Sequence, residues 1–272
     1  MYRLILILLL FFCHSAFSQN KIELIGKAHP GHLMIGKTMN NSTVYLNDKQ
    51  IKIDSNGVFV FGFDRDDIGK QILKIVFDDG SVETKELILQ KRDYDIQKIN
   101  DLEQKYVSPP KDILEKIEKE TKMITEARKK IDSTTIAYYN SGFMRPVEGG
   151  RISGVFGSQR ILNGEAKNPH NGIDIALPSG TPVYAMADGV VCIKGDDFHY
   201  NGNFVLLDHG QGLNSVYVHL LKTFVIDGER VIKGQKIGEV GSTGRSTGPH
   251  LHWGVQWYKK RIDPLSVLEL KF

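Results

Sequence analysis

Four histidines and one aspartate lie in three short motifs of the second half of the chain: His170 and Asp174, then His219, then His250 and His252. Zinc binds imidazole nitrogen and carboxylate oxygen, and a catalytic zinc site typically has three protein ligands and an open fourth position. Two histidines and an aspartate satisfy that count, and two histidines remain for proton transfer or oxyanion stabilisation. The residue types therefore indicate metal-assisted hydrolysis of amide bonds.

The spacing within the motifs allows these side chains to meet in one pocket. Gly172 disfavours a helix around His170, so the segment up to Asp174 is predicted to pass from a loop into a strand. Even spacing in an extended chain leaves two side chains on one face. The same period places His250 and His252 on a shared face, about 7 Å apart along a strand.

The order and surroundings of these motifs resemble those of the lysostaphin-type, or LytM-type, metallopeptidases of family M23. The similarity covers about residues 142–263 and includes the runs 151–157, 180–183 and 241–252. A His-x-His pair alone is a weak signal. Its combination, in family order, with His-x-x-x-Asp and a lone intervening histidine is specific.

The resemblance implies one zinc ion per chain, bound by His170, Asp174 and His252, and a catalytic pair formed by His219 and His250. One member of the pair activates the attacking water and the other stabilises the oxyanion, in an order that the sequence leaves open. The implied fold is a compact antiparallel β domain that cleaves peptide bonds of bacterial peptidoglycan. We expect cleavage of D,D cross-links between stem peptides, with a glycine bridge as the other candidate bond.

Three further polar residues of this region match no ligand position. His209 is expected as a turn residue, and His199 as a residue that lines the groove or lies on the surface. Arg245, in the glycine-rich loop before His250, is expected either to hold a substrate carboxylate or to brace the loop. The alternative function is a catalytically inactive LytM-like regulator that activates a cell-wall amidase, but such proteins typically lack zinc ligands.

The composition is that of an ordinary globular protein. Of the 272 residues, 41% are hydrophobic and 25% are charged, and the formal net charge is +3. A chain of this length has room for a full core and a second, smaller domain. No dense basic stripe accompanies the charge, so no nucleic-acid partner is expected. No glycine-rich phosphate loop leads into a helix, so no cofactor other than zinc is predicted.

The first residues predict export. Arg3, an apolar run over residues 4–12 and a small-x-small site at residues 16–18 are typical of a signal peptide, here residues 1–18. The run is too short to span a bilayer, so we expect no transmembrane span after cleavage, and a location in the periplasm, the cell envelope or outside the cell. Cys13 leaves with the signal peptide. Cys192 then has no disulfide partner and is expected to be a small buried residue.

The remaining pattern predicts a mainly β chain in three parts. Residues 19–99 carry apolar runs at 42–53, 58–63, 72–77 and 82–89, separated by Asn-Gly and Asp-Gly turns, and form a sandwich-like β module. Residues 100–141 form a helical linker with one amphipathic helix, which begins near Pro109 and Pro110. Residues 142–272 form the antiparallel peptidase domain. Inhibition of the groove by the module or the helix, and the oligomeric state, stay open.

Overall fold

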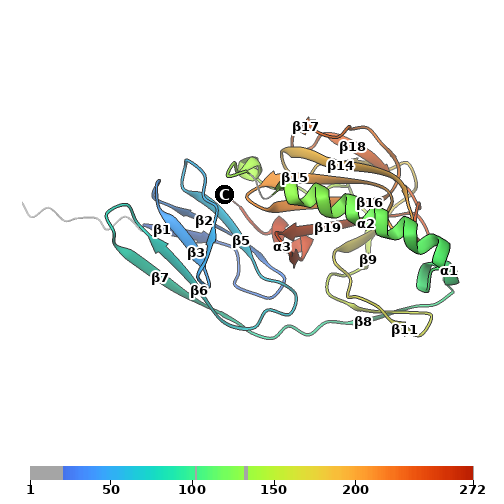
Figure 1. The fold of residues 1–272 in the computed structure, drawn as a ribbon, viewed down its shortest axis with the longest axis horizontal. Helices are drawn as coiled ribbons and strands as arrows, with labels where there is room; N and C mark the ends of the chain where they lie inside the picture. Colours follow the sequence, from blue (N-terminus) through green and yellow to red (C-terminus); the bar gives the residue numbers. More distant parts are fainter. Residues whose placement is uncertain (1–20, 102, 132–133, 272) are drawn as a thin grey trace, which may run out of the picture.

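The structure, a computed structural model, describes residues 21–101, 103–131 and 134–271. It is mainly β, as predicted, with a strand-rich N-terminal module and a larger antiparallel sheet in the C-terminal half (Figure 1). The predicted signal peptide and Cys13 lie outside the described residues. Within the described part, none of the helices is both long and apolar enough to cross a bilayer.

Two antiparallel sheets form the N-terminal module. Their buried residues, such as Ile35 and Phe59 of one sheet and Val44 and Ile75 of the other, belong to a single hydrophobic cluster. The first sheet has the order β1-β2-β5 and the second β4-β3-β6-β7. The bounds are β1 (Ile22–Ile25), β2 (Leu33–Thr38), β3 (Thr43–Leu46), β4 (Lys49–Ile51), β5 (Val58–Gly62), β6 (Gly69–Val76) and β7 (Val82–Leu89).

The apolar run 42–53 is not one strand but the hairpin β3–β4. Its turn residues Asn47 and Asp48 both have positive φ, at 49° and 62°. Two-residue hairpin turns favour this left-handed conformation, because its twist matches that of the strands, and Asn and Asp tolerate it better than most residues. The Asn-Asp pair is thus the local signal that divides the run.

The C-terminal half is a ten-stranded antiparallel sheet with the main order β17-β14-β15-β16-β19-β12-β9. Strands β13 and β18 pair with each other, β18 also pairs with β16, and β20 pairs with β19. The bounds are β9 (Arg151–Gly154), β12 (Ile173–Ala176), β13 (Pro182–Tyr184), β14 (Gly189–Phe198), β15 (Gly202–Gly210), β16 (Leu213–Thr223), β17 (Arg230–Val231), β18 (Lys236–Val240), β19 (His250–Trp257) and β20 (Lys260–Ile262).

A third, small sheet joins the two halves. The chain leaves the N-terminal module and forms β8 (Ile96–Ile99), which pairs in parallel with β10 (Gln159–Leu162), and β10 forms a hairpin with β11 (Glu165–Ala166). Figure 1 shows this path from the module to the hairpin. Because the segment after β11 leads directly to His170, β8 contributes to positioning the site. The domain boundaries themselves remain predictions.

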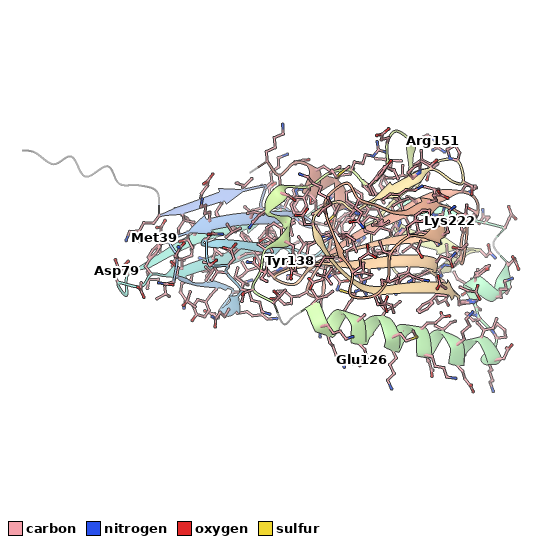
Figure 2. All side chains as sticks on the ribbon, turned by 90° about the horizontal axis from the view of Figure 1, so that it is seen from above. Met39, Asp79, Glu126, Tyr138, Arg151 and Lys222 are labelled. Atoms are coloured by element: carbon pink, nitrogen blue, oxygen red, sulfur yellow. The ribbon has the colours of Figure 1, made fainter. Side chains whose placement is uncertain are left out.

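The helical segment consists of a short α1 (Gln104–Val107) and the long α2 (Lys111–Ile131). α2 begins directly after Pro110, as the proline pair predicted. It lies along the flank of the C-terminal sheet, where Figure 2 shows most of its charged side chains turned outward. Its Ala127 packs with Phe198, Phe204 and other residues of β14–β16, and Cys192 packs against the same cluster as a partly buried residue.

The N-terminal module is packed directly against the C-terminal half. Their buried apolar residues form one continuous cluster that runs from Phe61 to Ile262 and Val267. Polar contacts add to it: the ion pair of Arg92 with Asp263 measures 2.8 Å, and Asp263 also caps α3 (Pro264–Leu268). The short 3-10 helix η1 (Tyr138–Ser141) completes the elements.

Candidate metal centre

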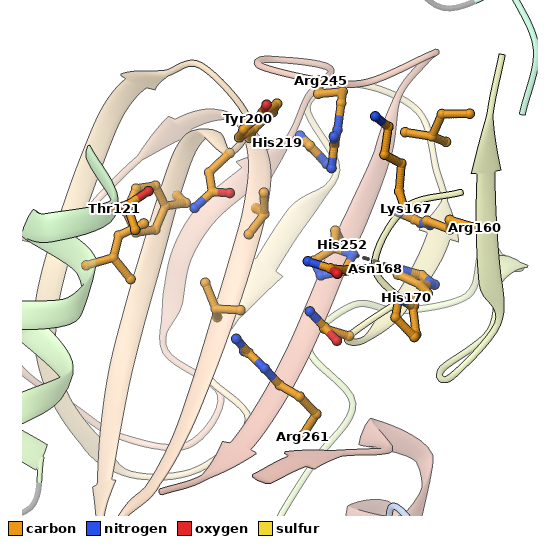
Figure 3. Close-up of a pocket in the computed structure, with 18 of the residues that line it drawn as sticks. Thr121, Arg160, Lys167, Asn168, His170, Tyr200, His219, Arg245, His252 and Arg261 are labelled. Atoms are coloured by element: carbon orange, nitrogen blue, oxygen red, sulfur yellow. Dashed lines mark hydrogen bonds between the residues drawn. The ribbon is translucent and has the colours of Figure 1, made fainter. Parts of the chain in front are cut away.

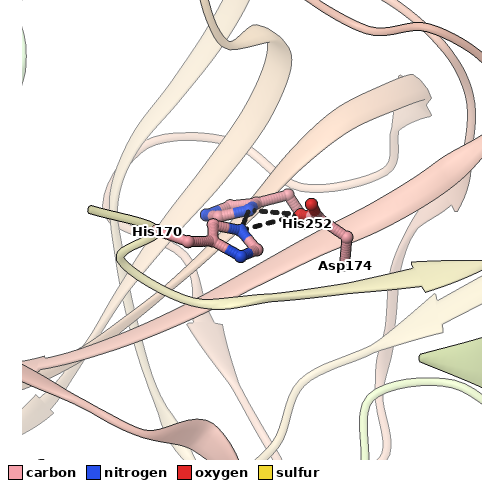
Figure 4. A group of neighbouring side chains, drawn as sticks. All are labelled: His170, Asp174 and His252. Carbon is pink, nitrogen blue, oxygen red and sulfur yellow. Dashed lines mark hydrogen bonds and ion pairs between the residues drawn. The ribbon is translucent and has the colours of Figure 1, made fainter. Parts of the chain in front are cut away.

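The register of three neighbouring strands brings the metal-binding residue types together. β12 pairs with β19 so that Asp174 lies opposite His252, and β9 places Gly154 on the other side of Asp174. His170 lies in the loop just before β12, as its spacing from Asp174 predicted. Figure 4 shows the three side chains converging from this loop and the two strands.

The converging atoms are His170 Nε2, Asp174 Oδ1 and His252 Nδ1. His170 Nε2 is 3.0 Å from both other atoms, and His252 Nδ1 is 2.7 Å from Asp174 Oδ1. Tetrahedral zinc with bonds of about 2.0–2.1 Å separates its ligand atoms by about 3.3 Å, so a small expansion of this triangle fits the ion. His170 Nδ1 donates to Val155 O at 3.0 Å, which leaves Nε2 with the lone pair that a metal needs.

The second oxygen of Asp174 is held by an arginine that the motifs did not reveal. Arg160, on β10, donates to Asp174 Oδ2 at 2.7 Å. Burial alone raises the pKa of Asp174, but its close contacts with His170 and His252 outweigh burial and hold that pKa well below its usual range. Burial lowers the pKa of His252 to about 4 despite the opposing effect of Asp174. The carboxylate and the neutral imidazole are the forms that bind a metal.

Glycine at position 154 is required by the cluster. A Cβ there would lie 2.5 Å from Asp174 Oδ2, which forces a shift of the carboxylate or the strand, and 3.1 Å from His170 Cε1, which is a tight contact. This explains physically why the run 151–157 ends its strand with a residue that has no side chain.

His219 reaches the site through an irregular backbone. It has φ of 65°, unusual for a residue other than glycine, and the pairing of β15 with β16 shifts register around it. Strict alternation would turn His219 away from the face of Val218, which lies opposite His252, yet both Val218 and His219 line the same pocket. The bulge therefore points His219 toward the group formed by His170, Asp174 and His252, called the metal cluster below.

His219 and His250 form the same type of hydrogen bond, from Nδ1 to a backbone carbonyl. The Nδ1 atom of His219 donates to Thr243 O and that of His250 to Gly248 O, each at 2.8 Å. Both Nε2 atoms are thus left to accept a proton. The rings are 4.8 Å apart, and His250 Nε2 lies 3.9 Å from Asp174 Oδ1. Burial, aided by the other histidines, lowers the pKa of His219 to about 3, so that its imidazole is neutral at ordinary pH.

The metal cluster opens into a pocket of about 790 Å³, called the groove here. Its sides are α2, the loop before His170 and the face of β15, β16 and β19, and Figure 3 shows His170 and His252 on one side and Thr121 of α2 on the other. A smaller hollow of about 60 Å³ adjoins Asp174, His219 and His250. The groove is large enough for a peptide segment.

The other polar residues have different surroundings. His209 is not a turn residue: it is fully buried in β15, with Nδ1 2.7 Å from Asp188 O and Nε2 2.7 Å from Ser215 Oγ. His199 packs between the rings of Tyr106 and Tyr200.

Arg245 lines the groove and contacts two residues outside its own loop, and both of its expected roles stay predictions. Its guanidinium stacks on Tyr200 at 4.5 Å from the ring centre and donates to Tyr106 O at 3.4 Å.

The motifs included Gly154 within the run 151–157 without giving it a role, and they missed Arg160. Arg160 acquires its role only through the pairing of β10 beside the cluster. Two further arginines that line the groove, Arg128 and Arg261, were missed for the same reason: they come from α2 and β20, far apart in the chain.

Comparison with known proteins identifies the class to which this fold and site belong. Residues 168–264 match the model of peptidase family M23. A solved structure described as a putative peptidase M23 from Pseudomonas aeruginosa is 27% identical, with a TM-score of 0.65 over 90% of this chain and 96% of that one. The chain therefore contains a peptidase family M23 domain over residues 168–264.

Two curated relatives are similar over the same region. The peptidoglycan DD-endopeptidase ShyA of Vibrio cholerae is 51% identical over 85 residues, which are 31% of this chain and 20% of that protein. The DD-carboxypeptidase/endopeptidase Mpg of Neisseria meningitidis is 44% identical over 117 residues, 43% of this chain and 27% of that protein. The chain thus spans only about a quarter of the length of these relatives.

Proposed function

We propose that the protein is an exported, zinc-dependent endopeptidase that hydrolyses peptide cross-links of peptidoglycan, with the D,D bond between stem peptides as its preferred target. The observation that carries the proposal is the arrangement of five polar side chains. His170 Nε2, Asp174 Oδ1 and His252 Nδ1 lie within 3.0 Å of one another, and two histidines stand beside them with Nε2 uncommitted.

In this proposal His170, Asp174 and His252 hold one zinc ion, which supplies a Lewis acid that polarises the scissile carbonyl and acidifies water. His219 and His250 supply the proton chemistry. Each is fixed by its Nδ1–H bond to a carbonyl, so each Nε2 is oriented to accept a proton from water or to donate one to the oxyanion or the leaving amine.

The substrate class rests on the relatives and on the groove. ShyA and Mpg are both named for cleavage at D,D bonds, and the groove of about 790 Å³ beside the cluster has room for a segment of such a peptide. These names and the complete set of polar residues support an enzyme over the alternative of a catalytically inactive amidase regulator.

The test is hydrolysis by the purified protein. We expect soluble fragments to be released from peptidoglycan, the release to stop with a chelator, and added zinc to restore it. Mass spectrometry of defined cross-linked muropeptides then identifies the bond. Wall digestion that continues in excess chelator would contradict the metal mechanism, and lysis that requires an added amidase would favour the regulator instead.

Export has its own measurement. N-terminal sequencing of protein recovered from the envelope fraction is expected to begin near Gln19, after loss of residues 1–18. Recovery of the chain with its first residues intact in the cytoplasm would contradict this part of the proposal.

A further inference from the structure

Two arginines line the groove without forming an ion pair among the described residues. Arg128 comes from α2 and Arg261 from β20, and both line the groove together with His170 and His252. Across residues 21–101, 103–131 and 134–271, neither forms an ion pair with a carboxylate within 4 Å. The contrast is Arg160, in the same groove, which is paired with Asp174.

Because Arg128 is partly buried, the lack of an ion-pair partner for its guanidinium is energetically unfavourable. Its Nε is buried and has no hydrogen-bond partner among the described residues. Burial, reinforced by the positive charge of Arg261, lowers the pKa of Arg128 to about 10. Burial also lowers the pKa of Arg261, against the opposing effect of the Asp64 carboxylate. Two poorly solvated guanidinium groups that repel each other are unfavourable in the free protein and are stabilised by an anion between them.

The placement of the pair relative to the metal cluster suits a substrate. Thr121, Ile124, Thr125 and Arg128 recur at helical spacing and all line the groove, so one face of α2 forms its side wall. Figure 3 shows Arg261 pointing from β20 into the groove below His252 and His170. One substrate peptide could therefore place a negatively charged group at the two arginines and its scissile amide bond at the cluster of His170, Asp174 and His252.

We propose that Arg128 and Arg261 form a subsite that binds a carboxylate of the substrate peptide. Guanidinium groups match carboxylates geometrically through paired N–H donors, and the partly apolar surroundings strengthen the contact. The inference rests on the proposed function, because a peptidoglycan stem peptide carries free carboxylates close to its amide bonds. It makes α2 a substrate-binding element rather than a solvated connection.

The experiment compares two synthetic cross-linked stem peptides that differ only in whether their free carboxylates are amidated. Binding is measured by fluorescence anisotropy with chelator-treated protein, so that no turnover interferes, and kcat/KM with the zinc-loaded protein. The variants are Arg128→Met and Arg261→Met, which keep an unbranched stem, and Arg128→Lys, which keeps the charge. Lys129→Met on the exposed side of α2 and Arg230→Met on the surface remove the same charge elsewhere.

We expect Arg128→Met and Arg261→Met to weaken binding of the carboxylate peptide by about 10- to 100-fold and to lower kcat/KM to a similar extent. Binding of the amidated peptide should change less than threefold in the same variants. Arg128→Lys should recover part of the loss, and the two controls should match the parent protein. Thermal unfolding adds an independent readout: Arg128→Met should not lower Tm, because it relieves the repulsion between the two guanidinium groups.

Two results would overturn the subsite. One is equal binding of both peptides by the parent protein, and the other is a Met variant that unfolds at lower temperature and loses both peptides alike, as a structural role requires. Failure of the proposed function appears differently, as intact carboxylate peptide after incubation with zinc-loaded parent protein.

Discussion

Arg160 donates from Nη2 to Asp174 Oδ2 at 2.7 Å, while Oδ1 of the same carboxylate faces the two histidines. Arg160 therefore holds Asp174 Oδ2 and leaves Oδ1 available to the site. It fixes the orientation in which Oδ1 completes the triangle with His170 Nε2 and His252 Nδ1.

Replacing Arg160 should weaken metal binding without removing a ligand. We expect Arg160→Met to raise the zinc dissociation constant about 10- to 100-fold, because groups that orient metal ligands typically contribute this much to affinity. Competition with a chromogenic chelator measures the constant. Arg230→Met, on the exposed surface, is the matched control, and an unchanged constant in Arg160→Met would show that Asp174 needs no support.

The separation of ligands from catalytic histidines can be tested by alanine replacement. His250→Ala should lower kcat by about 10²- to 10⁴-fold while the protein still binds zinc, because it removes proton transfer but no proposed ligand. His170→Ala should lose the zinc itself. Metal analysis alongside peptide hydrolysis distinguishes them, and a zinc-free His250→Ala protein would place His250 among the ligands.

The absence of a side chain at position 154 should matter for the metal. Gly154→Ala places a Cβ 2.5 Å from Asp174 Oδ2, so either the carboxylate or β9 must shift. We expect zinc affinity to fall about 10-fold or more. Gly248→Ala is the control for metal content, because a Cβ there meets nothing within 4 Å. Equal zinc content and affinity in both variants would contradict the steric argument.

His209 predicts how stability depends on pH. Burial lowers its pKa from 6.5 to about 4 in the folded protein. Above pH 6.5 both states are neutral there and no effect arises; as the pH falls from 6.5 to 4, only the unfolded state takes up the proton, so stability is lost. At pH 4.5 the loss amounts to about 2–3 kcal/mol.

The comparison is with His209→Asn, whose side-chain amide can still donate to Asp188 O. Denaturant unfolding at pH 7.5 and pH 4.5 should show a smaller loss of unfolding free energy in the variant, by that amount. Parallel pH profiles for the two proteins would mean that His209 is protonated in the folded state or that its surroundings open below pH 6.

The sequence predicted the fold class and the main elements because their signals are local. Proline before α2 and the alternating runs of the sheet depend on neighbours in the chain. The run 42–53 was divided at Asn47 and Asp48, where a two-residue turn competes with a continuous strand. Likewise, residues 231–238 contain the end of β17 and the start of β18, which pair with different strands.

At the site, the motifs identified the five polar residues that the structure brings together, but not what holds them. The backbone bulge at His219 arises from the pairing of β15 with β16, and strict alternation would have predicted the opposite face. Arg128, Arg160 and Arg261 come from three separate elements. Their proximity is a consequence of tertiary packing, which a single sequence does not display.

The side wall formed by α2 has a further consequence for where the catalytic unit of this chain begins. The segment matched by the family, residues 168–264, contains neither α2 nor β8. A domain excised at those limits would keep His170, Asp174 and His252 but would lose α2 and, with β10, the Arg160 that holds Asp174. Exchanging α2 alone between relatives would therefore test whether this helix sets substrate preference while the residues that support the cluster stay in place.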